Sequence, residues 1–332
     1  MRKIKWLLSI ITICILTFTL MSCGKQSSIE TVRVGEVTRS IFYAPQYVAI
    51  SKGFFEKEGL NVELKTTWGG DKTMTSLLSD GIDVALVGSE TSIYVAAQGS
   101  DDPIINFAQL TQTDGTFLVA REKVDNFSWD QLKGKTFLGQ RKGGMPQMVG
   151  EYVLKEHNID PKNDLTLIQN IDFANVSSAF ASGTGDYVQL FEPTASIFEK
   201  EGKGYIVASF GEESGKVPYT TFMSKNSFLK ENPETAEKFT RAIYNAQQWV
   251  DTHSAKEVAE AIAPYFDDTS IDTIETVVER YKTQDSFATN PVLDKEEWEN
   301  LQRIMDEAGE LPKRIDHKTL VNTKIATDVM EQ

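Results

Sequence analysis

Cysteine and histidine are scarce in this sequence, and that scarcity excludes several kinds of site. The 332 residues include only two cysteines, Cys14 and Cys23, which both lie near the amino terminus. The body of the chain therefore has no thiol for a disulfide, a metal cluster or a nucleophile. The three histidines, His157, His253 and His317, lack metal-ligand spacing, and we expect them at the surface. We predict no metal and no cofactor.

Catalytic and nucleotide-binding motifs are also missing. The chain contains no G-x-S-x-G, no H-E-x-x-H and no G-x-x-x-x-G-K-[ST] pattern. It shows no internal repeat and no low-complexity segment. We therefore predict no catalytic residues and a protein that binds rather than catalyses.

Positive charge is in short supply. The chain has 34 Lys and Arg against 48 Asp and Glu, a net charge of −14. An acidic surface keeps a protein in solution and repels polyanions, so nucleic acid is not an expected partner.

Long hydrophobic runs are confined to the first residues. Arg2, Lys3 and Lys5 precede an apolar run from Trp6 to Met21 that carries no charge. This pattern is typical of a secretory signal peptide. The alternative is an uncleaved membrane anchor, for which the run is short against the roughly 20 residues that a span needs.

The end of that run resembles the lipobox of bacterial lipoproteins, with a small residue, Ser22, directly before Cys23. The resemblance implies cleavage before Cys23, acylation of its thiol, and attachment to the extracytoplasmic face of the cell membrane. We therefore assign residues 1–22 to a signal peptide and 23–30 to a polar tether. Loss of residues 1–22 removes three basic residues and no acid, which leaves 31 against 48 and a net charge of −17.

The rest of the chain alternates short apolar runs with helical periodicity, which predicts an α/β fold. We expect strands at 32–35, 61–65, 83–88, 116–120, 135–139, 186–190, 204–210 and 219–223, and helices at 43–58, 73–79, 148–157 and through most of 233–305. The length suggests two lobes. The expected limits are 31–118 for the first part of lobe 1, 119–219 for lobe 2, and 220–332 for the return to lobe 1 with the carboxyl-terminal helices. Residues 117–120 and 219–223 would form a two-strand hinge.

Unusual residues gather after three predicted strands of the first lobe. Parallel sheets bind ligands beyond the carboxyl ends of their strands, and glycine there lets backbone N–H groups approach a ligand. Each aromatic taken alone is better explained by surface or core packing, but the coincidence of three strand ends predicts a binding site. The candidate residues are Ser40, Phe42, Tyr43, Trp68, Gly69, Gly70, Ser89, Glu90 and Thr91.

Two further segments in the second lobe extend this candidate site. Lys142, Gly143, Gly144 and Met145 follow a strand and open a helix, a pattern that favours an anion; the alternative is an ordinary glycine turn. Glu192 follows the strand at 186–190. Its carboxylate would select a ligand amine or ring N–H, unless it caps a helix or forms a salt bridge at the hinge.

The segments Phe42–Ala49 (FYAPQYVA) and Lys52–Glu63 (KGFFEKEGLNVE) resemble the opening of the nitrate, sulfonate and thiamine-precursor binding proteins of ABC importers. The likeness extends from about Val32 to the carboxyl-terminal helices. It implies a type II periplasmic-binding-protein fold, in which two α/β lobes hold a ligand in the cleft between them. It also implies a permease and its ATPase as partners, and a monomer.

Alternatives to this interpretation remain open. A sensory lipoprotein or an adhesin could share the fold, as does a fungal enzyme of thiamine-precursor synthesis. The chemistry of that enzyme needs a histidine and a cysteine-rich loop, and the loop is missing here. For the ligand, the aromatic faces, the carboxylate and the glycine turns favour a small planar heterocycle such as a thiamine-related pyrimidine. The alternative is an aliphatic sulfonate or a similar oxyanion.

Overall fold

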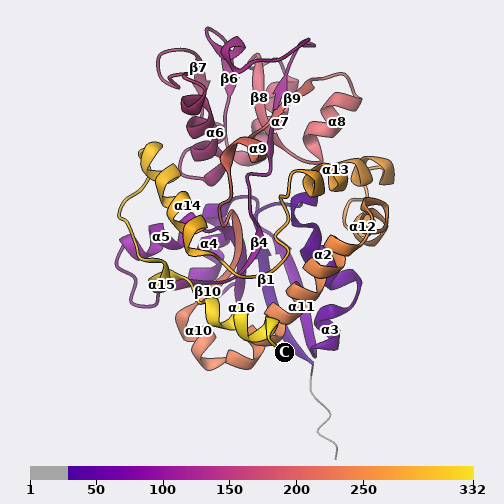
Figure 1. The fold of residues 1–332 in the computed structure, drawn as a ribbon, viewed down its shortest axis with the longest axis vertical. Coiled ribbons are helices and arrows are strands. Elements are labelled where there is room, and N and C mark those ends of the chain that lie inside the picture. Colours follow the sequence, from indigo (N-terminus) through magenta and orange to yellow (C-terminus); the bar gives the residue numbers. More distant parts are fainter. Residues whose placement is uncertain (1–28) are drawn as a thin grey trace, which may run out of the picture.

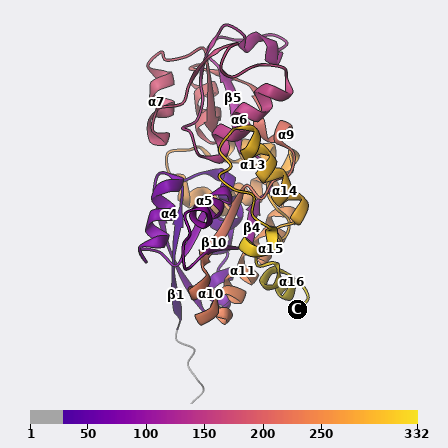
Figure 2. The same ribbon diagram turned by 90° about the vertical axis from the view of Figure 1, so that its left-hand side faces the viewer.

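The computed structural model describes residues 29–332, which form two α/β lobes, each built on a five-stranded mixed sheet (Figure 1). The predicted signal peptide and Cys23 lie outside the described residues. The view turned by 90° shows the second lobe above the first, with α14 running beside the junction (Figure 2). The predicted α/β fold with two lobes is confirmed.

The sheet of the first lobe has the strand order β2-β1-β3-β10-β4. Strand β1 pairs in parallel with β2 and β3, and β10 returns antiparallel between β3 and β4. These strands are β1 (Glu30–Glu36), β2 (Leu60–Thr66), β3 (Val84–Gly88), β4 (Ile104–Thr111) and β10 (Thr220–Lys225). The carboxyl ends of β1, β2 and β3 thus point toward the second lobe, which is where a ligand site is expected.

The sheet of the second lobe has the order β7-β6-β8-β5-β9. Strand β6 is parallel to β7 and β8, whereas β5 runs antiparallel to β8 and β9. Its strands are β5 (Thr116–Ala120), β6 (Thr136–Leu138), β7 (Thr166–Ile168), β8 (Tyr187–Phe191) and β9 (Tyr205–Ser209).

The chain passes between the sheets at residues 112–115 and again at 215–219. Both predicted hinge strands lie inside a sheet, since β5 sits between β8 and β9, and β10 sits between β3 and β4. The first passage therefore precedes the expected limit at 118. Asp114 fixes it by accepting a hydrogen bond of 2.6 Å from the backbone N–H of Thr116.

Helices cover both sheets. The first lobe carries η1 (Ile41–Tyr43), α2 (Ala44–Ser51), α3 (Phe54–Lys57), α4 (Gly70–Leu78), α5 (Glu90–Ala97), α10 (Asn226–Glu231), α11 (Pro233–Thr252), α12 (Ala255–Ile262), η4 (Ala263–Tyr265), α13 (Ile271–Thr283), α14 (Lys295–Glu307), α15 (His317–Leu320) and α16 (Thr323–Met330). The second carries η2 (Trp129–Leu132), α6 (Met145–Glu156), η3 (Phe173–Asn175), α7 (Val176–Ala181), α8 (Thr194–Lys200) and α9 (Phe210–Ser214).

The predicted stripe on α11 is confirmed. Ala236, Phe239, Ile243, Ala246 and Val250 recur at three- and four-residue spacing, and all five are buried. The helix packs against α2 and α16. Burial of such stripes, rather than cross-linking, holds the fold, because residues 29–332 contain no cysteine.

The helix predicted over 43–58 is broken. Gly53 adopts φ 67° and separates α2 from α3, a left-handed conformation that glycine accepts at little cost. His317, predicted at the surface, is instead buried, and its Nε2 lies 2.9 Å from the carbonyl oxygen of Leu293.

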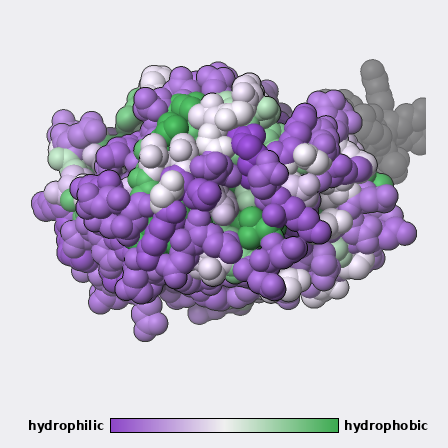
Figure 3. All heavy atoms as spheres, turned by 90° about the horizontal axis from the view of Figure 1, so that it is seen from above, coloured by the Kyte–Doolittle hydropathy of each residue, from purple (hydrophilic) through white to green (hydrophobic). Residues whose placement is uncertain are grey.

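The polarity of the surface and the lengths of the helices indicate whether the described residues could cross a membrane. Seen from above, the molecule presents mainly hydrophilic residues, with apolar residues in small separate groups (Figure 3). Among the helices of residues 29–332, none combines the length and apolar character needed to cross a bilayer.

Candidate functional site

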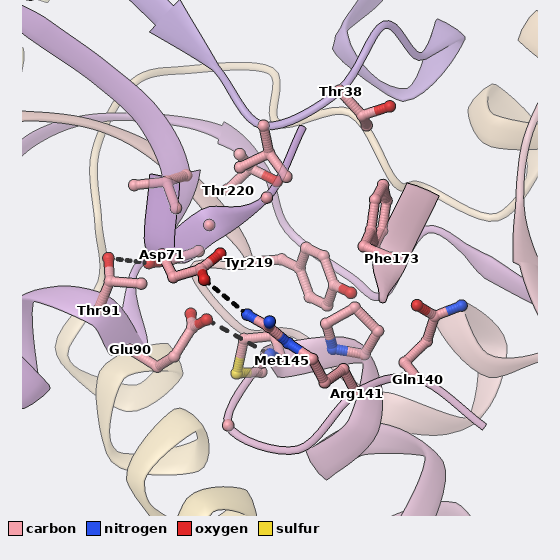
Figure 4. Close-up of a pocket in the computed structure, with 18 of the residues that line it drawn as sticks. Thr38, Asp71, Glu90, Thr91, Gln140, Arg141, Met145, Phe173, Tyr219 and Thr220 are labelled. Carbon is pink, nitrogen blue, oxygen red and sulfur yellow. Dashed lines mark hydrogen bonds and ion pairs between the residues drawn. The ribbon is translucent and has the colours of Figure 1, made fainter. Parts of the chain in front are cut away.

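A cavity of about 480 Å³ lies between the two lobes (Figure 4). Its volume falls in the range of small-molecule sites, roughly 300–1,000 Å³. First-lobe residues that line it are Val37, Thr38, Tyr43, Gly69, Gly70, Asp71, Val87, Gly88, Glu90, Thr91, Tyr94, Gln98, Thr220 and Glu310. The second lobe and the return passage contribute Gln140, Arg141, Lys142, Gly143, Gly144, Met145, Pro146, Phe173, Phe191 and Tyr219.

Part of the first-lobe lining comes from residues that follow the carboxyl ends of parallel strands. Tyr43 follows β1, Gly69 and Gly70 follow β2, and Glu90 and Thr91 follow β3; all five line the cavity. Gly69 has φ 145°, a backbone conformation that residues other than glycine rarely adopt. It allows the chain to turn sharply from β2 into α4.

Glu90 carries the most unusual electrostatics of the cavity. Its side chain is only 4% exposed, and its Oε1 accepts a hydrogen bond of 3.3 Å from the backbone N–H of Met145 in the opposite lobe. Its Oε2 has no hydrogen-bond partner among residues 29–332. Burial raises the pKa of Glu90 to about 8, and the backbone N–H groups of Glu90 and Met145 oppose that rise.

The glycine turn of the second lobe sits across from Glu90. Lys142, Gly143, Gly144 and Met145 all line the cavity, as predicted. Gly143 has φ 92°, and its N–H donates to Oε1 of Gln147 over 2.9 Å. Gly144 is the amino-terminal cap of α6. The N–H of Gly143 therefore bonds to a side chain of α6, and the N–H of Met145 bonds to the Glu90 carboxyl group of the first lobe.

An ion pair joins the lobes at the same cavity. Nη2 of Arg141, before α6, lies 2.8 Å from Oδ2 of Asp71 at the start of α4 (Figure 4). Burial alone would raise the pKa of Asp71, but the hydrogen bond and charge of Arg141 hold it below its usual value. Sequence reasoning missed both residues, although each directly adjoins a glycine or lysine that it selected.

Aromatic rings form part of the cavity wall. Phe173 and Phe191 lie with ring centroids 6.0 Å apart, and Tyr43 and Tyr219 are buried beside them. Burial raises the pKa of both tyrosines, so their hydroxyls stay neutral at physiological pH. Phe173, Phe191 and Tyr219 were not among the predicted site residues. Their signal was weak, because a lone aromatic after a strand is usually packing.

Five predicted residues do not line the cavity. Trp68 has φ 60° and is 48% exposed. The hydroxyl of Ser89 is buried and donates to the carbonyl oxygen of Pro218. The hydroxyl of Ser40 donates to the carbonyl oxygen of Glu192 over 2.7 Å, which ties the two lobes together. Phe42 and Glu192 also lie outside the cavity lining.

Phe42 lies in a ring cluster at the junction of the lobes. Its ring centroid is 5.1 Å from that of Tyr281, 5.6 Å from Tyr219 and 6.1 Å from Phe191. A Cβ added at Gly115, on the first passage between the lobes, would come within 2.7 Å of this ring. Phe42 therefore packs at the hinge.

Glu192 has its own partners, away from the cavity. Its Oε2 accepts from the N–H of Ser196 over 2.8 Å, and its Oε1 accepts from the Ser196 hydroxyl and from Arg280. Burial raises its pKa, while the Arg280 charge opposes that rise. This arrangement matches the second interpretation, a helix cap with a hinge salt bridge.

No group of three or more His, Cys, Asp or Glu side chains in the described part of the chain is placed to hold a metal. None of the three histidines lines the cavity.

The NMT1-like family profile matches residues 26–263. A protein of Bacillus subtilis (strain 168), the "Putative binding protein YtlA", is 68% identical over 317 residues, which are 96% of this chain and 95% of the relative.

Two solved structures share the fold. The nitrate-binding protein NrtA of Synechocystis has a TM-score of 0.71 at 18% identity and covers 91% of this chain and 89% of its own. The alkanesulfonate-binding protein SsuA of Xanthomonas axonopodis has a TM-score of 0.69 at 17% identity, and the match covers 88% of this chain and 98% of SsuA. The chain belongs to the NMT1-like family and has the type II periplasmic-binding-protein fold.

Proposed function

We propose that this protein is the substrate-binding subunit of an ABC importer, held by an acylated Cys23 on the extracytoplasmic face of the cell membrane. Its partners would be a permease and the ATPase of that permease. The lipobox at Leu20–Cys23 supports the anchor, and the family supports the role in import.

Ligand capture would follow from the position of the cavity. Its lining comes from both lobes, so a bound ligand contacts both and favours the closed arrangement over the open one. The closed form would then be the one presented to the permease.

A small planar heterocycle, such as a thiamine-related pyrimidine, is the ligand class that we favour. The observation that carries this choice is a cavity whose wall combines aromatic rings with glycine turns and a buried carboxyl group. Rings of Tyr43, Phe173, Phe191 and Tyr219 offer apolar faces, and flat ligands gain from such contacts.

An oxyanion such as an aliphatic sulfonate is the second candidate. Lys142 and the start of α6 favour it, since helix amino termini attract negative charge. Against it stands the Met145 N–H, which already faces Glu90.

Mass spectrometry of whatever co-purifies with the folded protein tests this proposal, followed by a thermal-shift panel of pyrimidines, sulfonates, nitrate and bicarbonate. A ligand that binds only the folded form stabilises it by about 2.7 kcal/mol at a hundredfold excess over Kd. A pyrimidine hit would support the favoured class. A panel in which no compound shifts the melting temperature, together with no co-purifying molecule, would refute the function.

The anchor has a separate test. In the full chain, Cys23→Ala should move the protein from the membrane fraction to the culture medium or periplasm, because acylation needs the thiol. Immunoblots of fractionated cells would show this, with Cys14→Ala as the matched control that stays at the membrane. Membrane retention of the Cys23→Ala protein would contradict lipidation at this residue.

A further inference from the structure

Three buried side-chain oxygens in the cavity wall lack a hydrogen-bond partner among residues 29–332. One is the Tyr219 hydroxyl, which can donate or accept. The other two are Oε2 of Glu90 in the first lobe and Oε1 of Gln140 in the second. Both side chains are at least nine-tenths buried, with exposures of 4% each. Gln140 uses its Nε2 to donate to the carbonyl oxygen of Gln189 over 2.6 Å, which leaves its oxygen facing the other cavity residues (Figure 4). Buried acceptors are rarely left unpaired, so each calls for a donor.

Contacts on both sides hold the Glu90 carboxyl group. A Cβ added at Gly88 would lie only 2.1 Å from Oε2 and 2.6 Å from Oε1, so glycine at the end of β3 is what admits the carboxyl group. From the second lobe, the N–H of Met145 reaches Oε1. The position of the carboxyl group in the cavity wall, with Oε2 against Gly88, is therefore built into the turn.

No cation of the described chain neutralises this carboxyl group. Arg141 pairs with Asp71 and with Asp172, at 2.8 and 3.4 Å, and Glu90 forms no ion pair with any described residue. The other titratable groups that line the cavity are Tyr43, Tyr94, Tyr219, Lys142 and Glu310. The three tyrosines are neutral, so they supply no charge to Glu90.

We propose that Glu90 determines which ligands the cavity accepts: its Oε2 takes an N–H or cationic group of the ligand while its Oε1 accepts the Met145 N–H of the opposite lobe. Gln140 accepts a second donor from the same ligand. This inference rests on the proposed binding function and narrows it to ligands with N–H donors. It also makes one side chain touch both the ligand and the opposing lobe, so an N–H ligand and lobe closure support each other.

An oxyanion brings only acceptors, so it leaves the Gln140 oxygen unpaired and cannot pair with an ionised Glu90. Because burial raises the pKa of Glu90 to about 8, its carboxyl group is largely protonated in the ligand-free protein at neutral pH, and in that form it can donate to an oxyanion. A cationic or N–H ligand favours the ionised form instead. Glutamine separates the two cases, since its amide donates permanently and carries no charge.

The test measures Kd by calorimetry for wild type, Glu90→Gln and Glu297→Gln with four compounds. Two carry N–H donors, 4-amino-5-hydroxymethyl-2-methylpyrimidine and benzamidine, and two are oxyanions, 1-propanesulfonate and nitrate. Glu90→Gln should weaken the N–H compounds roughly 10- to 100-fold, the loss expected for a charge-assisted hydrogen bond, and leave oxyanions unchanged or tighter. Glu297→Gln should change neither class. Glu297 is a matched control, because it is a partly buried carboxylate bonded to Gln109 outside the cavity.

Each outcome decides the matter. Selective loss of N–H compounds in Glu90→Gln supports the inference. Binding of oxyanions alone to wild type, or equal affinity of an N–H compound for wild type and Glu90→Gln, overturns it while the binding function stands. Failure of all four compounds, of the wider thermal-shift panel and of co-purification would overturn the proposed function, and this inference with it.

Discussion

Glu90 and Glu192 occupy equivalent places in the two lobes but have opposite surroundings. Each follows the carboxyl end of an interior strand, β3 or β8, and each is at most 4% exposed with a pKa raised by burial. Glu192 binds Arg280 and Ser196, whereas Glu90 is bonded only by backbone N–H groups and has an unpaired Oε2. The same residue at the same kind of strand end thus forms an ion pair in one lobe and has none in the other.

A large loss of stability is expected from removing the partner of Glu192. Arg280→Met should lower the free energy of unfolding by about 2–3 kcal/mol, because it leaves a buried carboxylate with only Ser196 for support. Urea denaturation followed by circular dichroism would measure it, and Arg280→Lys, which keeps the charge, should lose less. Equal stability of Arg280→Met and wild type would show that the ion pair of Glu192 does not stabilise the fold, and the contrast with Glu90 would then be wrong.

At Glu90 the expected effect on stability depends on pH. Its pKa in the folded state, about 8, lies above the ordinary 4.5, so the folded form holds its proton more tightly than the unfolded form does. Stability from this group is full below pH 4.5 and is lost as the pH rises toward 8. The melting temperature of ligand-free wild type should therefore fall relative to Glu90→Gln across this interval and run parallel to it above. A constant difference from pH 4 to pH 9 would contradict the raised pKa.

The smallest effect is expected at the ion pair beside Glu90. The side chains of Arg141 and Asp71 are 44% and 55% exposed, and exposed pairs contribute about 0.2–1 kcal/mol. Asp71→Asn should therefore weaken ligand binding no more than about fivefold, and less at high salt. A loss as large as that of Glu90→Gln would show that this pair, rather than Glu90, couples the lobes.

Strand positions and strand-end residues were largely predictable from the sequence. Alternation and glycines located β1, β2, β3, β5, β6, β8, β9 and β10, and nine predicted residues line the cavity. Strand β4 and the three-residue strand β7 were missed, although the eight residues of β4 are all buried and Pro103 precedes them. A continuous apolar run shows no alternation, so it gives no strand period to detect.

Partner choice was the part that sequence could not provide. The residues near Glu192 in the sequence give no indication that Arg280 is its partner, because Arg280 lies 88 residues away on α13. Likewise, the pairing of Asp71 with Arg141 depends on two lobes meeting. Strand ends are local properties, whereas the partner of a buried charge is set by the tertiary fold.

The ring cluster around Phe42 constrains how the protein can open. Phe42 touches Phe191 of the second lobe and Tyr219 of the passage at once, with Gly115 pressed against it. Separating the lobes by translation would expose these apolar rings to water, whereas a rotation about them would keep them buried. We therefore expect the lobes to open by a rotation of limited amplitude about this cluster. The rate of ligand release should then depend on Phe42, although Phe42 does not line the cavity.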